Sequence, residues 1–113
     1  MRDALSKPTT GKGETLTLWR ERPFTVRHGG DLMRGVFDRV VIHEVGGAPA
    51  RVDLIDFKTD RIEPDESNIT TIAEHYRPQM QAYRDALSAM LALDRSQITC
   101  SLLLLACGKR IEV

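Results

Sequence analysis

The chain has 113 residues, of which 16 are basic and 16 acidic, so its formal net charge is zero. This length suits a single domain with one hydrophobic core and excludes a helicase motor within the same segment. No G-x-x-x-x-G-K-[S/T] motif is present, so any ATP hydrolysis would reside elsewhere. The balanced charge also argues against non-specific binding of nucleic acid through the overall electrostatic field.

The sequence predicts a short leading segment and one folded domain. Residues 1–15 are polar and rich in Gly, Pro and Thr, which is typical of a linker or a frayed leading segment. Residues 16–113 are expected to form the domain, as a fragment of a larger protein. No signal peptide or apolar span of membrane length is recognised, so we expect a cytoplasmic protein without a membrane partner.

Three strands are predicted in the first half of the chain. They are expected at about residues 15–27, with an interruption at Pro23, at 32–43 and at 51–59. The dipeptide Gly46-Gly47 supplies the positive φ angles of a tight turn, so the second and third strands should form an antiparallel hairpin.

Three charged side chains take inward positions on this hairpin. Alternation places Asp38 on the same face as Val36, and Asp56 and Lys58 on the same face as Leu54. A single D-x-K is usually a solvated pair at a strand end or a structural salt bridge. Two inward acidic positions on neighbouring strands instead predict that both carboxylates face one cavity, where they need a partner or a metal.

The chemistry of these residues indicates a divalent cation. Two close carboxylates repel each other, and a cation removes this conflict. Oxygen ligands without a neighbouring Cys or His favour Mg²⁺ or Mn²⁺ over Zn²⁺. Carboxylates that hold Mg²⁺ beside a phosphate are a common arrangement for phosphodiester hydrolysis, in which Lys58 would stabilise the negative charge that develops.

The second half of the chain predicts a loop, a helix and two strands. Residues 60–68 read as the loop, and the capping-box pattern of Thr71 and Glu74 predicts a helix that reaches about residue 93, with Pro78 near its beginning. Residues 98–106 are expected to form a buried strand, and Gly108 turns the chain into a final one. Six helix residues form an apolar stripe that should cover the sheet: Ile72, Tyr76, Met80, Tyr83, Leu87 and Leu91.

Four motifs occur in a characteristic order: Glu21-Arg-Pro-Phe24, Gly35-Val-Phe-Asp38-Arg39, Leu54-Ile-Asp56-Phe-Lys58 and Tyr76-Arg-Pro-Gln79-Met-Gln-Ala-Tyr83. This set resembles the PD-(D/E)XK nucleases, and among them the nuclease domains of RecB-like and AddA-type helicase-nucleases. The resemblance covers residues 16–113. It implies a restriction-endonuclease-like α/β fold, with a central mixed sheet of about five strands flanked by helix.

The resemblance also implies roles for individual residues. It makes Asp38 and Asp56 metal ligands, with the main-chain carbonyl of Phe57 as a third oxygen, and Lys58 the catalytic lysine. Glu21 matches an acidic residue that reaches the metal directly or through water. The family commonly carries a further helix upstream, which is not expected in this segment, so it stays open whether the segment is active alone.

Two helix residues match a Q-x-x-x-Y element of the family. Gln79 and Tyr83 lie four residues apart on one helix face, and the resemblance implies that they order the site and contact the substrate backbone. By themselves they would read as a solvated amide and an aromatic residue at the edge of the core. His28, His43 and His75 show no metal-ligand spacing and are expected to be structural or exposed.

The function that follows is a metal-dependent deoxyribonuclease, which we expect to be an Mg²⁺-dependent exonuclease domain of a helicase-nuclease in double-strand-break repair. Its expected partners are DNA and a helicase, either in the same chain or in a partner subunit. Two alternatives stay open. One is a stand-alone or CRISPR-associated RecB-like exonuclease, and the other is a non-catalytic module of the same fold that docks DNA or a partner.

Overall fold

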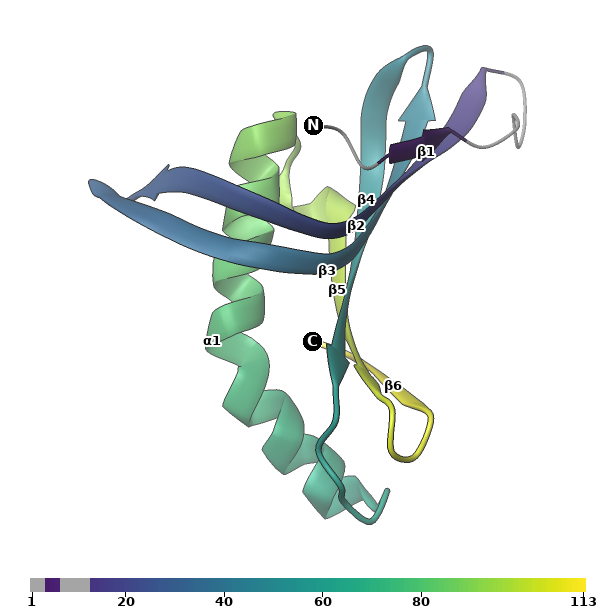
Figure 1. The fold of residues 1–113 in the computed structure, drawn as a ribbon, viewed down its shortest axis with the longest axis vertical. Coiled ribbons are helices and arrows are strands. Elements are labelled where there is room, and N and C mark those ends of the chain that lie inside the picture. The colour runs from purple at the N-terminus through teal and green to yellow at the C-terminus, as the bar shows by residue number, and fades with distance from the viewer. Residues whose placement is uncertain (1–3, 7–12) are drawn as a thin grey trace.

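The computed structural model describes residues 4–6 and 13–113. Their strands form one sheet of six strands in the order β1-β2-β3-β4-β5-β6, with a long helix beside it (Figure 1). The elements are β1 (Ala4–Ser6), β2 (Glu14–His28), β3 (Asp31–Val45), β4 (Ala48–Lys58), α1 (Glu66–Leu91), the short 3₁₀ helix η1 (Arg95–Gln97), β5 (Ile98–Leu104) and β6 (Lys109–Glu112).

The sheet is mixed, as the predicted fold class requires. Strands β1 to β4 are antiparallel neighbours, β5 runs parallel to β4, and β6 is antiparallel to β5. Helix α1 makes the crossover that a parallel pair of strands needs. The α/β prediction is confirmed, with β1 as a strand beyond the expected five. This strand lies within residues 1–15, so the described portion of that segment includes sheet structure.

One face of the sheet packs against α1 and forms the core. Met80, Ala86 and Leu87 of the helix are buried, and Tyr76 and Tyr83 pack beside them. Burial of such an apolar stripe is what stabilises a helix of this kind against a sheet. The predicted stripe is thus confirmed. No helix among the described residues combines the length and apolar character that crossing a membrane requires.

Helix α1 begins earlier than its sequence pattern predicted. The N-cap is Asp65, whose side chain accepts a hydrogen bond from the backbone N–H of Asn68 at 2.9 Å. The expected cap, Thr71, instead lies inside the helix and donates its hydroxyl to the carbonyl of Ser67 at 3.0 Å. Pro78 accordingly lies in the middle of the helix and removes one of its backbone hydrogen bonds.

The β3–β4 turn agrees with its prediction. Gly46 and Gly47 connect the two strands with φ angles of 61° and 81°, which residues with a Cβ rarely adopt. By contrast, β2 is not interrupted at Pro23, which pairs with Val36. Proline is tolerated there because β1 pairs with β2 only at residues 17–19, which leaves that side of β2 without a described neighbour at Pro23.

The β2–β3 hairpin changes the face that it turns toward the core. Trp19 and Val40 are paired and buried, and three positions further along the ladder Phe37, paired with Arg22, is buried as well. Strict alternation would keep the inward residues of one strand all odd or all even. The prediction that Val36 shares an inward face with Asp38 is therefore wrong, since Val36 is 46% exposed. Between the two phases the hairpin bends away from β4 (Figure 1).

Candidate active site

Asp38 and Asp56 lie where β3 and β4 separate. The ladder between these strands ends at the pair Arg39–Ile55, one step before the position at which Asp38 and Asp56 would be opposite each other. Strand β4 stays paired with β5 as far as Lys58, whereas β3 turns away with β2 (Figure 1). We call this point of separation the fork. Beyond Ile55, the edge of β4 that faces β3 is released from the sheet ladder.

The backbone of β2 is irregular at the same level. Glu21 has a φ of 45°, a left-handed value that is uncommon in residues other than glycine. The pair Glu21–Asp38 is missing from the β2–β3 ladder, although the pairs on both sides of it are present. Such strained residues in strands bend the chain and often lie at functional sites. The irregularity explains why the hairpin changes its inward face around Asp38.

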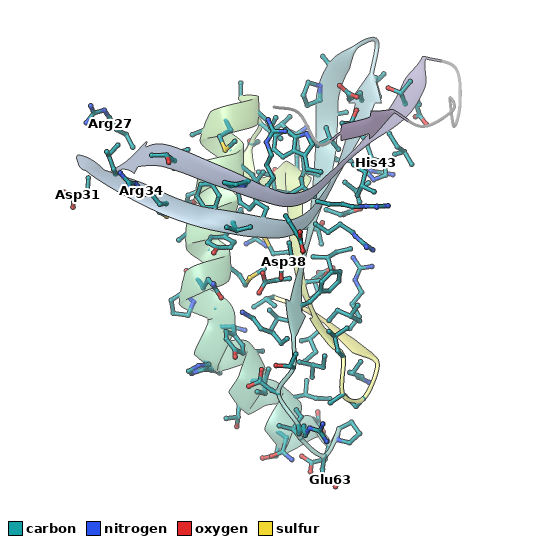
Figure 2. The ribbon with its side chains drawn as sticks, viewed as in Figure 1. Arg27, Asp31, Arg34, Asp38, His43 and Glu63 are labelled. Atoms are coloured by element: carbon teal, nitrogen blue, oxygen red, sulfur yellow. The ribbon has the colours of Figure 1, made fainter. Side chains whose placement is uncertain are left out.

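The side chain of Asp38 bridges the fork. It is half-buried, and its Oδ2 accepts a hydrogen bond from the backbone N–H of Phe57 at 2.9 Å. In an extended strand, the N–H and C=O of one residue point to the same edge. The carbonyl of Phe57 therefore faces the fork as well. Figure 2 shows Asp38 at the angle between the β2–β3 hairpin and the lower part of β4.

Asp56 is buried beside the second charged residue of its strand. It is 4% exposed, and its Oδ2 lies 2.7 Å from Nζ of Lys58. Burial raises the pKa of Asp56, the hydrogen bond with Lys58 opposes that rise, and neighbouring Asp38 adds to it, so that the pKa lies above its usual value. The charged form is thus disfavoured despite Lys58. Two carboxylates with one lysine leave the fork short of positive charge.

The ammonium group of Lys58 is held between strand and helix. Besides Asp56, it donates a hydrogen bond to Oε1 of Gln79 at 3.1 Å. It also lies 4.1 Å from the ring centroid of Tyr76, within the range of a cation–π contact. The side chain of Lys58 is 16% exposed. A cation in this position is partly shielded from water and can act on a substrate oxygen that approaches the fork.

Gln79 and Tyr83 continue this chain of contacts along α1. Nε2 of Gln79 donates to the hydroxyl of Tyr83 at 3.3 Å. The ring of Tyr83 packs edge-on against Phe24 and Phe37, with centroid distances of 5.3 and 5.5 Å. Gly35 makes room for this cluster, because a Cβ there would lie 2.8 Å from the Phe24 ring and 3.0 Å from the Tyr83 hydroxyl. The aromatic packing thus connects the hairpin to the helix beside the fork.

Six of the seven predicted site residues come together in this way: Asp38, Asp56, Phe57, Lys58, Gln79 and Tyr83. Glu21 is at the same level of the sheet but is exposed. Its side chain makes no hydrogen bond or ion pair with any residue that the structure describes. Contact of Glu21 with a metal remains a prediction.

Tyr76 and Asp60 were missed as site residues by the sequence analysis. The Tyr76 hydroxyl donates to the Asp60 carboxylate, at 3.0 Å from Oδ1 and 3.3 Å from Oδ2. Burial and, secondly, this hydrogen bond raise the pKa of Tyr76, so the phenol stays protonated near neutral pH. The sequence analysis placed Tyr76 in the apolar stripe and at the start of the fourth motif, but gave it no role at the site. The available signal was its spacing, since it lies three residues before Gln79 on the same helix face.

The oxygen donors at the fork fit a hard divalent cation. Asp38, Asp56 and the carbonyl of Phe57 are the donor types that Mg²⁺ and Mn²⁺ prefer, and the pKa of Asp56 is raised mainly by burial, with a smaller contribution from neighbouring Asp38. Within residues 4–6 and 13–113, no three His, Cys, Asp or Glu side chains form a metal-binding group. Mg²⁺ commonly binds one or two carboxylates and keeps several waters, so this small donor set matches its coordination.

Comparison with known proteins assigns the chain to a class. A family model of the PD-(D/E)XK nuclease superfamily matches residues 2–111. The chain therefore belongs to this superfamily, and the predicted resemblance is confirmed.

The chain is also similar to particular helicase-nucleases. It is 31% identical over 102 residues to an ATP-dependent helicase/nuclease subunit of Streptococcus suis (strain 98HAH33), a match of 85% of this chain. It is 32% identical over 82 residues, or 63% of the chain, to the protein of the same name in Limosilactobacillus reuteri subsp. reuteri (strain JCM 1112). The matches span only 7% and 6% of these two relatives.

Proposed function

We propose that the chain is the Mg²⁺-dependent DNA exonuclease domain of a RecB/AddA-like helicase-nuclease that acts in double-strand-break repair and recombination, with Mn²⁺ as an alternative ion. The main support is the convergence of Asp38, Asp56 and Lys58 at the fork in a member of the PD-(D/E)XK nuclease superfamily. The helicase component of the proposal rests on the similarity to proteins named ATP-dependent helicase/nuclease subunits.

In this proposal, Asp38, Asp56 and the carbonyl of Phe57 hold the cation at the open edge of β4. When bound, the ion supplies Lewis-acid polarisation of the phosphate and favours deprotonation of water. Lys58 donates to an oxygen of the reacting phosphate and stabilises the charge that develops in the transition state. Its contacts with Asp56 and Gln79 keep the ammonium near that oxygen before the reaction begins.

The helix residues have a separate proposed role in substrate placement. Gln79 is exposed and lies between Lys58 and Tyr83, so it can exchange one of these hydrogen bonds for a contact with the DNA backbone. Tyr83 is held by the aromatic cluster of the hairpin. Correct placement of the reacting groups supplies a large share of the rate in such reactions. Glu21 would help to position the ion through water.

The experiment is cleavage of labelled linear DNA by the full protein, with any partner subunit that it requires, in Mg²⁺ and in EDTA. Asp38→Asn and Asp56→Asn should each lose at least about a hundredfold in rate, because several kcal/mol of charge stabilisation disappear. Asp53→Asn is the matched control, since Asp53 lies on the same strand but contacts His43 instead. Unchanged cleavage by Asp56→Asn would refute the assignment of the site.

A second substrate separates exonuclease from endonuclease action. An exonuclease needs a DNA end, so covalently closed circular single-stranded DNA should stay intact under conditions in which the linear form is degraded. Cleavage of the circle at a comparable rate would replace the exonuclease proposal with an endonuclease that uses the same residues.

A further inference from the structure

Three groups surround the ammonium of Lys58, and only two of them have a place in the proposed function. Asp56 and Gln79 accept hydrogen bonds at 2.7 and 3.1 Å. The third group is the ring of Tyr76, whose centroid lies 4.1 Å from Nζ. Tyr76 is on α1, whereas Lys58 ends β4, so this contact joins two elements that meet only through tertiary packing.

The position of Tyr76 is itself fixed from the strand side. Its hydroxyl donates to Asp60, two residues after Lys58, at 3.0 Å from Oδ1. On the helix itself, the ring also makes a T-shaped contact with that of His75, with a centroid distance of 4.7 Å. A ring that is anchored at its hydroxyl and packed on a helix presents a stable face to a neighbouring cation.

A lysine needs such a constraint in order to act on a reacting group. Its four-carbon stem has high rotamer freedom, and an ammonium that wanders by an ångström is poorly placed for the transition state. Lysine has three N–H donors, of which Asp56 and Gln79 use two. A ring face attracts the cation as a whole through its quadrupole. It can therefore hold Nζ without consuming the third donor, which stays available to a phosphate oxygen.

We propose that Tyr76 is a positioning residue, whose ring face holds the Lys58 ammonium in place for hydrolysis of the DNA phosphodiester bond. The inference rests on the proposed function, because it gives Lys58 a task at the reacting phosphate. It goes beyond that function in assigning a share of the rate to a residue that touches neither the metal ligands nor the substrate.

The test varies the electron density of the ring while its shape is kept. Tyr76 is replaced in the full protein by Phe and then by mono-, di- and trifluorinated phenylalanine, and kcat and KM for linear DNA are measured in Mg²⁺. Fluorine withdraws electrons from the ring face and weakens its attraction for a cation. We expect kcat to fall stepwise, by roughly tenfold in total for a contact shielded from water, with KM nearly unchanged. Tyr76→Phe should keep most of the activity.

Two controls separate this inference from the proposed function. Two measurements come first: absence of Mg²⁺-dependent cleavage by the wild-type protein would refute the proposed function, whereas full activity in Lys58→Ala would refute the role of Lys58 and with it that of Tyr76. If Lys58→Ala is impaired, a kcat that is the same across the fluorinated series overturns the role of Tyr76 alone. In the Lys58→Ala background, the series should have no effect on residual cleavage, because the cation is gone. An equal loss in both backgrounds would mean that the ring acts only through packing.

Discussion

Strands β3 and β4 carry two charged clusters, one at each end of their shared ladder. The fork cluster consists of Asp38, Asp56 and Lys58. The hairpin-end cluster consists of His43, Arg51 and Asp53, in which Nε2 of His43 lies 3.3 Å from Oδ2 of Asp53 and Nη2 of Arg51 lies 3.2 Å from Nδ1 of His43. Figure 2 shows Asp38 and His43 well separated along the same strand.

The two clusters differ in burial and in backbone pairing. In the hairpin-end cluster the side chains of His43 and Asp53 are 23% and 35% exposed, whereas the side chain of Asp56 is 6% exposed. His43 pairs with Arg51 and the ladder continues beyond it to Val45, with a register shift between His43 and Glu44, whereas no pair follows Arg39–Ile55 at the fork. Ionisable groups that are exposed and bonded to each other are commonly structural, whereas buried carboxylates with unbalanced charge are typical of functional sites.

The comparison teaches that composition does not distinguish these clusters. Each contains at least one aspartate and one cation on the same two strands. What separates them is whether the strand edge beside them is paired with another strand. An unpaired edge leaves room for a substrate and offers a carbonyl oxygen as a metal ligand. Substitutions at matched positions in the two clusters therefore test the assignment directly.

The largest contrast is expected in catalysis. Lys58→Ala should reduce DNA cleavage by at least about a hundredfold, the scale observed when one preorganised charge-stabilising group is lost. Arg51→Ala should leave the rate within about twofold, since an exposed pair contributes little. Cleavage rates of the full protein under saturating Mg²⁺ provide the measurement. Equal losses in the two variants would remove the distinction between the clusters.

A second contrast concerns metal binding. Mg²⁺ or Mn²⁺ should stabilise the folded protein by about 2.7 kcal/mol at a hundredfold excess over Kd, because the ion binds the folded site and not the unfolded chain. Asp56→Asn should abolish this stabilisation, whereas Asp53→Asn should retain it. Thermal unfolding at increasing metal concentration measures the effect. An undiminished shift in Asp56→Asn would place the ion elsewhere.

Two glycine substitutions, one beside the fork and one in the β3–β4 turn, should lower the free energy of unfolding by different amounts. Gly35→Ala is expected to destabilise the fold by about 1–3 kcal/mol, because the added Cβ would overlap the Phe24 ring and approach the Tyr83 hydroxyl. Gly47→Asn should cost less than about 1 kcal/mol, since Asn tolerates a positive φ and nothing lies within 4 Å. Urea unfolding measures both. An unchanged unfolding free energy in Gly35→Ala would show that the aromatic cluster shifts to accommodate the added Cβ at little cost.

The smallest effect is a dependence of stability on pH in the metal-free protein. The folded-state pKa of Asp56 lies above its ordinary value of 3.8, so the folded state holds this proton more tightly than the unfolded chain does. The contribution is fully present below the unfolded pKa and is lost as pH rises through the folded pKa. Asp56→Asn should flatten the unfolding free energy over that window, measured in EDTA. In Asp53→Asn, the unfolding free energy should change with pH as it does in the wild type. A steeper loss of stability with rising pH in Asp56→Asn would contradict the predicted direction of the Asp56 contribution.

Much of the framework was set by local patterns in the sequence. The dipeptide Gly46-Gly47 determines the β3–β4 hairpin through its backbone angles, and the hairpin brings the strands of Asp38 and Asp56 together. The D-x-K spacing places Asp56 and Lys58 on one strand face, where they form an ion pair. The apolar stripe of α1 predicted its packing on the sheet, because a periodic face must be buried against a partner.

Local patterns failed where long-range contacts decide the conformation. Alternation predicted Val36 as inward, but at the irregular backbone of Glu21 the inward phase changes, so that it differs between the two parts of the β2–β3 hairpin. The helix start was placed at Thr71, although the side chain of Asp65 caps the first turn and the hydroxyl of Thr71 is satisfied inside the helix. Both errors come from applying a single pattern. Strand alternation did not take the irregular backbone at Glu21 into account, and the capping-box pattern did not take the alternative cap at Asp65 into account.

The sequence by itself thus determined which residues carry the charge at the fork and which strands bring them together. Only the tertiary structure decided that β3 and β4 separate immediately beyond the pair Arg39–Ile55, and that the helix returns Tyr76 and Gln79 to the ammonium of Lys58. The physical reason is that strand separation depends on packing of the distal hairpin against α1, through Phe24, Phe37 and Tyr83. Those residues are far apart along the chain, and no local pattern encodes their contact.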